Sequence, residues 1–224
     1  MRRARRPYPD REAAGRELAG QLTAYAGRSD VVVLALPRGG VPVALPVARA
    51  LGAPLDILVV RKLGVPGQPE LAMGAIAGFA EGVEVVRNDR VISALHVCDH
   101  QVEAVHRTEL AELRRRELAY REDRPAIPVR SRVVIVVDDG LATGSTMTAA
   151  VAAARHQQPG RVVVAVPIGA ADACAVLRQL ADEVVCLWTP RSFGAVGQGY
   201  LDFRAVQDDE VRALLGAAAN HTAG

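Results

Sequence analysis

The sequence of 224 residues is poor in aromatic side chains, poor in cysteine and nearly neutral. Aromatic residues make up 4% of the chain and hydrophobic residues 50%, so the core must consist mainly of Val, Leu and Ala. The net charge of +2 argues against a nucleic-acid partner. No run approaches the roughly 18 apolar residues that a membrane-spanning helix needs, so we expect no membrane partner.

The three cysteines (Cys98, Cys174 and Cys186) are too few and too widely spaced for a disulfide framework or a zinc site. We therefore expect reduced thiols and a cytoplasmic location. The Arg-rich start, residues 2–6, is followed by Pro7 where a signal peptide would need an apolar stretch. This pattern predicts a solvated tail.

Apolar runs alternate with helical patterns along the chain. The expected strands are 31–36, 55–60, 133–137, 161–166 and 183–188, and the expected helices are 11–26, 41–51, 146–156, 170–181 and 208–215. Between the second and third of these strands we expect a Gly- and Pro-rich loop (63–71), a strand pair (72–77 and 83–87) and a long helix (89–121). The alternation predicts an α/β fold with a mostly parallel sheet and helices on both faces.

Residues 133–148 carry the clearest chemical signal. The five apolar residues of 133–137 predict a buried parallel strand, and two carboxylates, Asp138 and Asp139, follow directly. A short turn then leads into an Ala-rich helix. The turn contains Ala142, Thr143, Gly144, Ser145 and Thr146.

This turn has the features of an anion site. Backbone N–H groups at a helix N-terminus favour a phosphate, and the hydroxyls of Thr143, Ser145 and Thr146 add donors. Gly144 allows close approach of the backbone. The spacing fits neither a Walker loop nor the dinucleotide pattern. Carboxylates accept hydrogen bonds from a diol, so the stretch suits a ribose 5-phosphate; the alternative is an ordinary strand-to-helix connection with an N-cap.

Two further loops carry cations. Pro37, Arg38, Gly39 and Gly40 follow a predicted strand and combine a guanidinium fork with exposed N–H groups; the alternative is a simple turn. Lys62 ends another strand as a point charge for phosphate, or merely flanks that strand. Because ligands bind beyond the carboxyl ends of parallel strands, we expect loops 37–40, 61–71 and 138–146 to share one rim.

These motifs resemble the phosphoribosyl-pyrophosphate (PRPP) motif and the pyrophosphate loop of the type I phosphoribosyltransferases (PRTases). In that family several apolar residues precede two acids and a Thr-Gly-x-Thr turn, which Asp138, Asp139 and the turn at 143–146 match. The Leu-Pro-Arg-Gly-Gly loop resembles the family's loop in which the peptide before the basic residue is often cis, here Pro37–Arg38. Residues 63–71 resemble its mobile lid.

The resemblance implies one type I PRTase-like domain over residues 1–224, with a mostly parallel twisted sheet. The core would span about residues 28–188. A small hood at about 189–206, with the N- and C-terminal helices, and a long inserted helix would complete it.

The resemblance also implies an activity in nucleotide metabolism. The chain would be a glycosyltransferase that moves ribose 5-phosphate from PRPP to a nitrogenous base and releases pyrophosphate. Asp138 and Asp139 would hold the ribose hydroxyls, Arg38, Gly39 and Lys62 the pyrophosphate, and residues 142–146 the 5-phosphate. The cofactor would be Mg²⁺, held mainly by PRPP near Asp138 and by no direct protein site. A PRPP-sensing regulator and a PRPP hydrolase stay open as alternatives, and we expect a homodimer.

Aromatic residues gather late in the chain. Four of the eight (one Trp, four Tyr and three Phe in all) are Trp188, Phe193, Tyr200 and Phe203. Trp188, Phe193 and Tyr200 could form a flat acceptor pocket, since stacking suits a planar base; the alternative is a small satellite core. Ala142 stands where family members that act on 6-oxopurines usually carry Asp.

The long helix at 89–121 interleaves acids with arginines, which predicts a solvated or subunit-contacting face. His96 and His100 lie four residues apart on it, and could form a metal pair. No third ligand stands out, so we expect no metal there.

Overall fold

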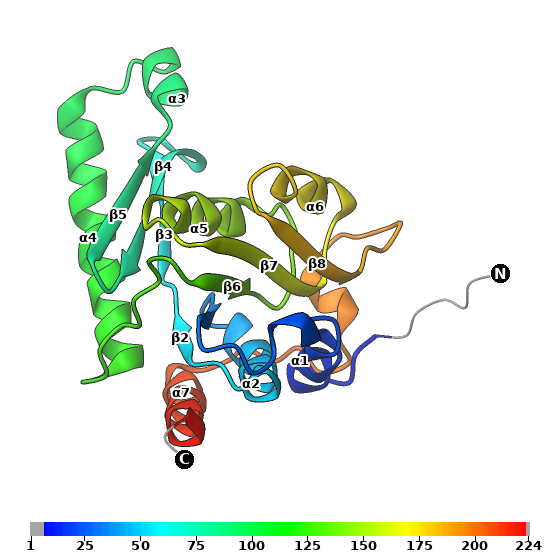
Figure 1. Ribbon diagram of the computed structural model, residues 1–224. Helices are drawn as coiled ribbons and strands as arrows, with labels where there is room; N and C mark the ends of the chain where they lie inside the picture. Colours follow the sequence, from blue (N-terminus) through cyan, green and yellow to red (C-terminus); the bar gives the residue numbers. More distant parts are fainter. Residues whose placement is uncertain (1–6, 223–224) are drawn as a thin grey trace.

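The computed structural model describes residues 7–222, which form two β-sheets surrounded by helices (Figure 1). The Arg-rich residues 2–6 lie outside the described part of the chain. The helices are α1 (Arg11–Ala19), α2 (Gly40–Leu51), α3 (Asp89–Ala94), α4 (Asp99–Arg121), α5 (Ser145–His156), α6 (Ala171–Leu177) and α7 (Asp208–Thr222). The strands are β1 (Val31–Ala35), β2 (Leu55–Ile57), β3 (Val60–Val65), β4 (Gln68–Phe79), β5 (Gly82–Arg87), β6 (Val133–Val137), β7 (Arg161–Ile168) and β8 (Glu183–Trp188).

The larger sheet has five parallel strands in the order β2-β1-β6-β7-β8, which confirms the expected α/β architecture. β1 and β6 are neighbours in full register, with Val31 opposite Val133 and Ala35 opposite Val137. The segments that follow these two strands therefore leave the sheet side by side at its carboxyl edge.

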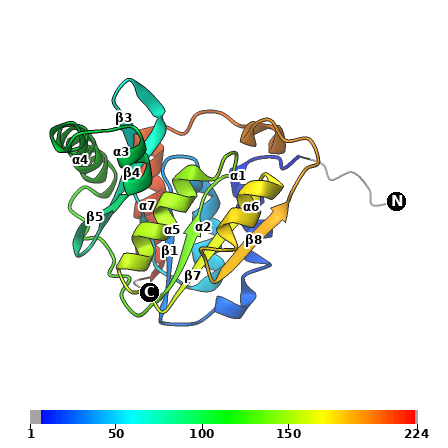
Figure 2. The same ribbon diagram turned by 90° about the horizontal axis from the view of Figure 1, so that it is seen from above.

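Successive side chains of β1 point to opposite faces of the sheet, as the strand geometry requires. Val31 and Val33 join the core cluster that includes α1 and α2, whereas Val32 and Leu34 join the cluster that includes α5 and α6. Figure 2 shows the two helix layers on either side of the sheet. Because both faces are covered, the strands read as continuous apolar runs in the sequence.

The smaller sheet is antiparallel, in the order β3-β4-β5, and α4 packs against β3 and β4. The expected pairing of 72–77 with 83–87 is confirmed. The expected irregular loop at 63–71 is wrong, because these residues form the β3–β4 hairpin. Gly67 occupies its turn with a φ of +81°, and the register shifts beside Gly64. The Gly and Pro residues thus mark a turn and a bulge within strands.

Two expected helices are interrupted. Helix 11–26 ends as α1 at Ala19, and a short 3₁₀ helix (Thr23–Tyr25) follows. Helix 89–121 is broken between α3 and α4, where His96 has a φ of +52°. His96 and His100 therefore do not share a helix, and the metal-pair hypothesis is wrong. Within residues 7–222 no group of three or more His, Cys, Asp or Glu side chains could hold a metal ion.

The start of the described chain is clasped to the segment before α7. The Tyr8 N–H donates to the carbonyl of Gly199 and the Leu201 N–H to that of Tyr8, both at 2.8 Å. Cys98, Cys174 and Cys186 are free thiols, as expected. No helix in the described range is both long and apolar enough to cross a lipid bilayer.

Candidate functional site

The loops after β1 and β6 meet at the carboxyl edge of the parallel sheet. The Leu36 N–H donates to the carbonyl of Val137 at 2.9 Å, which extends the pairing of the two strands into the loops. A Cβ on Gly39 would lie 2.0 Å from Oδ2 of Asp139, and one on Gly40 would lie 2.7 Å from the carbonyl oxygen of Val137. A side chain at Gly40 would collide with backbone atoms, and one at Gly39 would displace the Asp139 carboxylate. The peptide between Pro37 and Arg38 is cis, as the sequence predicts.

Asp138 and Asp139 lie at the centre of this edge. Burial, and then the charge of Asp139, raise the pKa of Asp138 well above its usual range. Burial also raises the pKa of Asp139, although the adjacent Arg11 guanidinium acts in the opposite direction. The Asp139 N–H donates to Oδ1 of Asp138 at 2.8 Å, and the Tyr200 hydroxyl donates to the Asp139 carbonyl at 2.6 Å. The backbone of the acidic pair is thereby fixed.

Arg11 contacts Asp139 directly, which sequence reasoning missed. Its Nε donates to Oδ2 of Asp139 at 2.9 Å, and its Nη2 lies 2.9 Å from the same oxygen. The available signal was a cation in the first turn of a helix capped by Asp10, where the helix dipole disfavours positive charge.

The turn at 142–146 presents donors to solvent. Gly144 adopts a φ of +73° immediately before α5 and provides no side-chain cap, and the Ser145 N–H donates to the Thr143 hydroxyl oxygen at a long 3.4 Å. Thr143, Ser145 and Thr146 are exposed, and the Thr143 and Ser145 hydroxyl oxygens lie 2.6 Å apart. The N-terminus of α5 is therefore open for an anion, with hydroxyls beside it.

A cavity of about 680 Å³ separates this edge from the smaller sheet and α4. Pro37, Lys62 and Thr146, which sequence reasoning assigned to one site, all line it. So does Arg116 of α4, which the sequence placed on a solvated face. The Arg116 Nε donates to Glu112 at 2.7 Å, and Arg115 shares that carboxylate. The wall that contains Lys62 therefore also contains Arg116 and Arg61, each of which is paired with a glutamate.

Arg38 is placed differently from the expectation. Its Nη1 lies 3.6 Å from Oδ1 of Asp208 at the start of α7, and both side chains are more than 40% exposed. The Tyr120 hydroxyl donates to the same Asp208 oxygen at 3.1 Å. Arg38 therefore faces α7 and does not line the cavity beside Lys62.

The late aromatic residues form a small core. The Tyr200 ring stacks on Phe203 with centroids 5.2 Å apart and lies 5.7 Å from Tyr8. Trp188 and Phe193 pack half-buried against the cluster of Tyr8, Ala14, Ile168 and Tyr200. Tyr200 therefore belongs to the satellite core that was the alternative interpretation, and its ring is not free to stack on a ligand.

Comparisons with known proteins find one family over most of the chain. A model of the phosphoribosyl transferase domain matches residues 7–202. Two Mycobacterium tuberculosis proteins, from strains CDC 1551 and H37Rv and named provisionally as phosphoribosyl transferases, are each 53% identical over 211 residues. The match covers 94% of this chain and 47% of each relative, so the chain spans about half the length of these relatives.

The fold has a solved counterpart. The crystal structure of the protein TT1426 from Thermus thermophilus is 43% identical to this chain, with a TM-score of 0.82. The superposition covers 93% of this chain and 97% of the Thermus chain.

Proposed function

Because the chain belongs to the phosphoribosyl transferase domain family, we propose that it transfers ribose 5-phosphate from PRPP to a nitrogenous base and releases pyrophosphate. One observation carries the proposal. The open N-terminus of α5 and the paired carboxylates Asp138 and Asp139 lie on one edge of the sheet, beside a cavity with cations on its far wall. PRPP has a group for each feature: its 5-phosphate matches the α5 N-terminus, its diol matches the carboxylates and its pyrophosphate matches the cations.

The turn at 142–146 would bind the 5-phosphate. The N–H groups at the start of α5 and the exposed hydroxyls of Thr143, Ser145 and Thr146 are its donors, and Ala142 completes the turn. This contact is remote from the reacting carbon. Its role is to orient the sugar so that the acceptor and the leaving group are in line.

Asp138 and Asp139 would accept hydrogen bonds from the ribose hydroxyls. The transition state develops positive charge on the sugar, and two carboxylates in a site shielded from solvent oppose that charge strongly. Burial raises the pKa of both carboxyl groups, and a positive charge that develops on the sugar would favour their ionised forms, as Arg11 already does at Asp139.

The pyrophosphate would lie across the cavity toward Lys62, and the Gly39 N–H would donate to it, whereas the Gly40 N–H already donates to the carbonyl of Leu36 at 3.0 Å. Arg38 would join them by leaving Asp208. The Arg38–Asp208 contact is long and exposed, and such pairs contribute little to stability, so a phosphate oxygen competes easily.

The donor set fits Mg²⁺. Asp138 and Asp139 offer hard carboxylate oxygens in the segment that leads into the turn at 142–146, and Mg²⁺ usually binds one or two carboxylates together with substrate phosphates. When bound, the ion would neutralise pyrophosphate oxygens and so favour their departure. The ion would be held mainly by PRPP, near Asp138.

Two other functions would use the same PRPP-binding site. Water as the acceptor would make the protein a PRPP hydrolase, and a site without turnover would make it a PRPP sensor. Trp188 and Phe193 remain the side chains proposed for the acceptor side, while Tyr200 is set aside. The cytoplasmic location and the homodimer also remain part of the proposal.

The test measures pyrophosphate release from PRPP and Mg²⁺, alone and with a panel of purine and pyrimidine bases, with the nucleotide product identified by mass. Release that depends on one base supports the transferase and identifies the acceptor. Release without any base indicates the hydrolase. Binding of PRPP in calorimetry without release indicates the sensor, and no PRPP binding would overturn the proposal.

A further inference from the structure

Arg11 joins the first helix to the acidic pair across 128 residues of sequence. We propose that Arg11 is a positioning residue, which holds Asp139 by Oδ2 so that Oδ1 is presented to a hydroxyl of the sugar. This inference rests on the proposed function and assigns a role in it to a side chain outside the family motifs.

Two neighbours confine the carboxylate of Asp139. Both Arg11 nitrogens, Nε and Nη2, contact Oδ2 at 2.9 Å. On the other side Gly39 lies so close that a Cβ there would be 2.0 Å from Oδ2 and 3.3 Å from Oδ1. The guanidinium of Arg11 and the backbone at Gly39 therefore restrict the rotation of the Asp139 carboxylate.

Arg11 is itself fixed by groups other than Asp139. Its Nη1 donates to the carbonyl of Arg204 at 2.9 Å, and its Cζ lies 3.9 Å from the centroid of the Phe203 ring. The residue is 9% exposed. A buried guanidinium held by these two groups loses little freedom when it binds a carboxylate, so it positions Asp139 firmly.

Lysine would not replace this arginine. The planar fork makes contacts through Nε, Nη1 and Nη2 while its face covers Phe203, whereas an ammonium group is a single point charge. The charge of Arg11 also opposes the repulsion between Asp138 and Asp139, which are adjacent and shielded from solvent.

The experiment compares two ligands by calorimetry in the presence of Mg²⁺. PRPP carries the diol, and inorganic pyrophosphate lacks it. Arg11→Gln is expected to weaken PRPP binding at least about tenfold, the scale of a lost supporting contact, and to leave pyrophosphate binding within about twofold. Arg11→Lys is expected to recover only part of the PRPP affinity.

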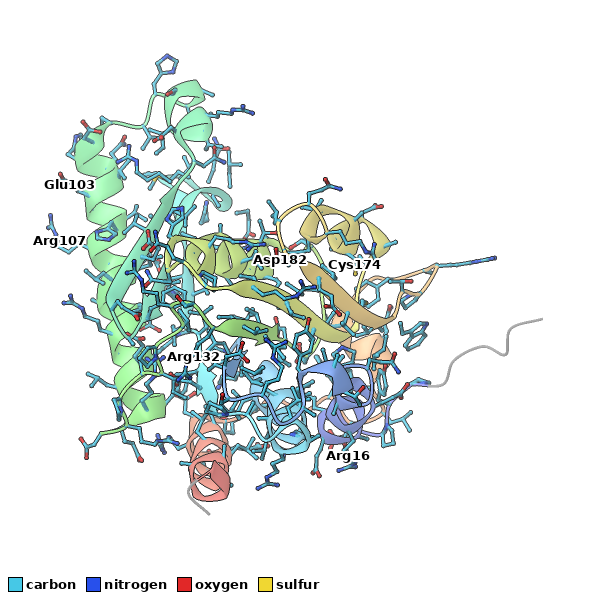
Figure 3. The ribbon with its side chains drawn as sticks, viewed as in Figure 1. Arg16, Glu103, Arg107, Arg132, Cys174 and Asp182 are labelled. Carbon is cyan, nitrogen blue, oxygen red and sulfur yellow. The ribbon has the colours of Figure 1, made fainter. Side chains whose placement is uncertain are left out.

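Arg16→Gln is the matched control. Arg16 lies on the same helix, points outward and pairs with Glu12, with its side chain 60% exposed (Figure 3). We expect this variant to bind both ligands as the wild type does. Circular dichroism checks each fold, and Arg11→Lys replaces Arg11→Gln in the comparison if the latter is unfolded.

The outcomes separate the two proposals. Wild-type protein that does not bind PRPP overturns the proposed function and this inference with it. If the wild type binds PRPP but folded Arg11 variants bind it equally well, only the role of Arg11 is overturned. An equal loss of PRPP and pyrophosphate affinity also overturns that role, because it would indicate a general structural defect.

Discussion

The two walls of the cavity are built on different physical principles. The sheet edge reaches the cavity through Pro37 and Thr146, and the same two loops contain glycines in close contact and the shielded carboxylates Asp138 and Asp139. The opposite wall, from the β3–β4 hairpin and α4, uses long cationic side chains at the surface, Lys62 and Arg116. The first wall is rigid and intolerant of added atoms, whereas the second can adjust.

This difference predicts how each wall responds to substitution. Changes at the sheet edge alter geometry that nothing nearby can restore, so their effects should be large. Changes on the hairpin and helix wall remove a charge that solvent and neighbouring cations partly replace, so their effects should be small and sensitive to salt.

The largest effect is expected from Asp138→Asn combined with Asp139→Asn. Losing both charges that oppose the cationic transition state should lower turnover at least about a thousandfold while the fold is retained. Steady-state pyrophosphate release measures the rate, and circular dichroism checks the fold. Normal turnover in this variant would remove the acidic pair from the mechanism.

Gly39→Ala is expected to be the next most damaging change. The added Cβ would lie 2.0 Å from Oδ2 of Asp139, so the carboxylate or the loop must move, and a displacement of about 1 Å can cost up to about a hundredfold. PRPP affinity by calorimetry measures the loss. Gly216→Ala is the control, because a Cβ there meets nothing within 4 Å. Equal affinities for both variants would show that the sheet edge is not rigid.

Lys62→Ala should weaken pyrophosphate binding roughly tenfold at low salt and less at high salt. The neighbouring Arg61 is the control, since it is already paired with Glu109 at 2.7 Å. Arg61→Ala should therefore change the affinity less than Lys62→Ala does. If the loss of pyrophosphate affinity does not depend on salt, Lys62 acts through fixed geometry, as the sheet edge does, and not mainly through its charge.

The smallest effect concerns stability. The pKa of Asp138 is raised in the folded protein, so the folded state holds this proton more tightly than the unfolded chain does. Ionisation then favours unfolding, and stability falls as the pH rises above about 4. Asp138→Asn should raise the Tm of the free protein by a few degrees at pH 7, and the gain should vanish below about pH 4.

Asp30→Asn provides the control of opposite sign. Arg28 lowers the pKa of Asp30, so its ionised form favours the folded state and the substitution should not stabilise the protein at pH 7. If Asp138→Asn lowers the Tm at neutral pH, burial is not the main influence on the pKa of Asp138.

The sequence predicted those parts of the site that are contiguous in the chain. Strand, acids and turn follow one another within residues 133–148, and the cis peptide and the glycines lie within residues 37–40. Parallel order then brings both segments to one edge. The fold class followed from the same alternation of apolar runs and helical patterns.

Arg11 and Arg116 could not be predicted in the same way. Each reaches the site from a helix whose own sequence pattern describes only that helix, and the contact depends on how the helix packs. The β3–β4 hairpin was missed because Gly and Pro residues favour loops locally, while pairing along β4 extends the strands past them. Tyr200 was misassigned because clustering in sequence does not tell a core from a pocket.

The clasp between Tyr8 and residues 199–201 also has a consequence for folding. It joins segments about as far apart along the chain as the fold allows, and contacts of high sequence separation form slowly because the loop they close is long. The helix that carries Arg11 packs on α2 and is synthesised early, but residues 199–204, which contact Tyr8 and Arg11, are synthesised much later. The sheet edge can therefore form the turn at 142–146 before Phe203 and Arg204 fix the Arg11 guanidinium beside Asp139. A ribosome-stalled chain that ends before residue 199 should contain the parallel sheet and still lack a finished acidic pair.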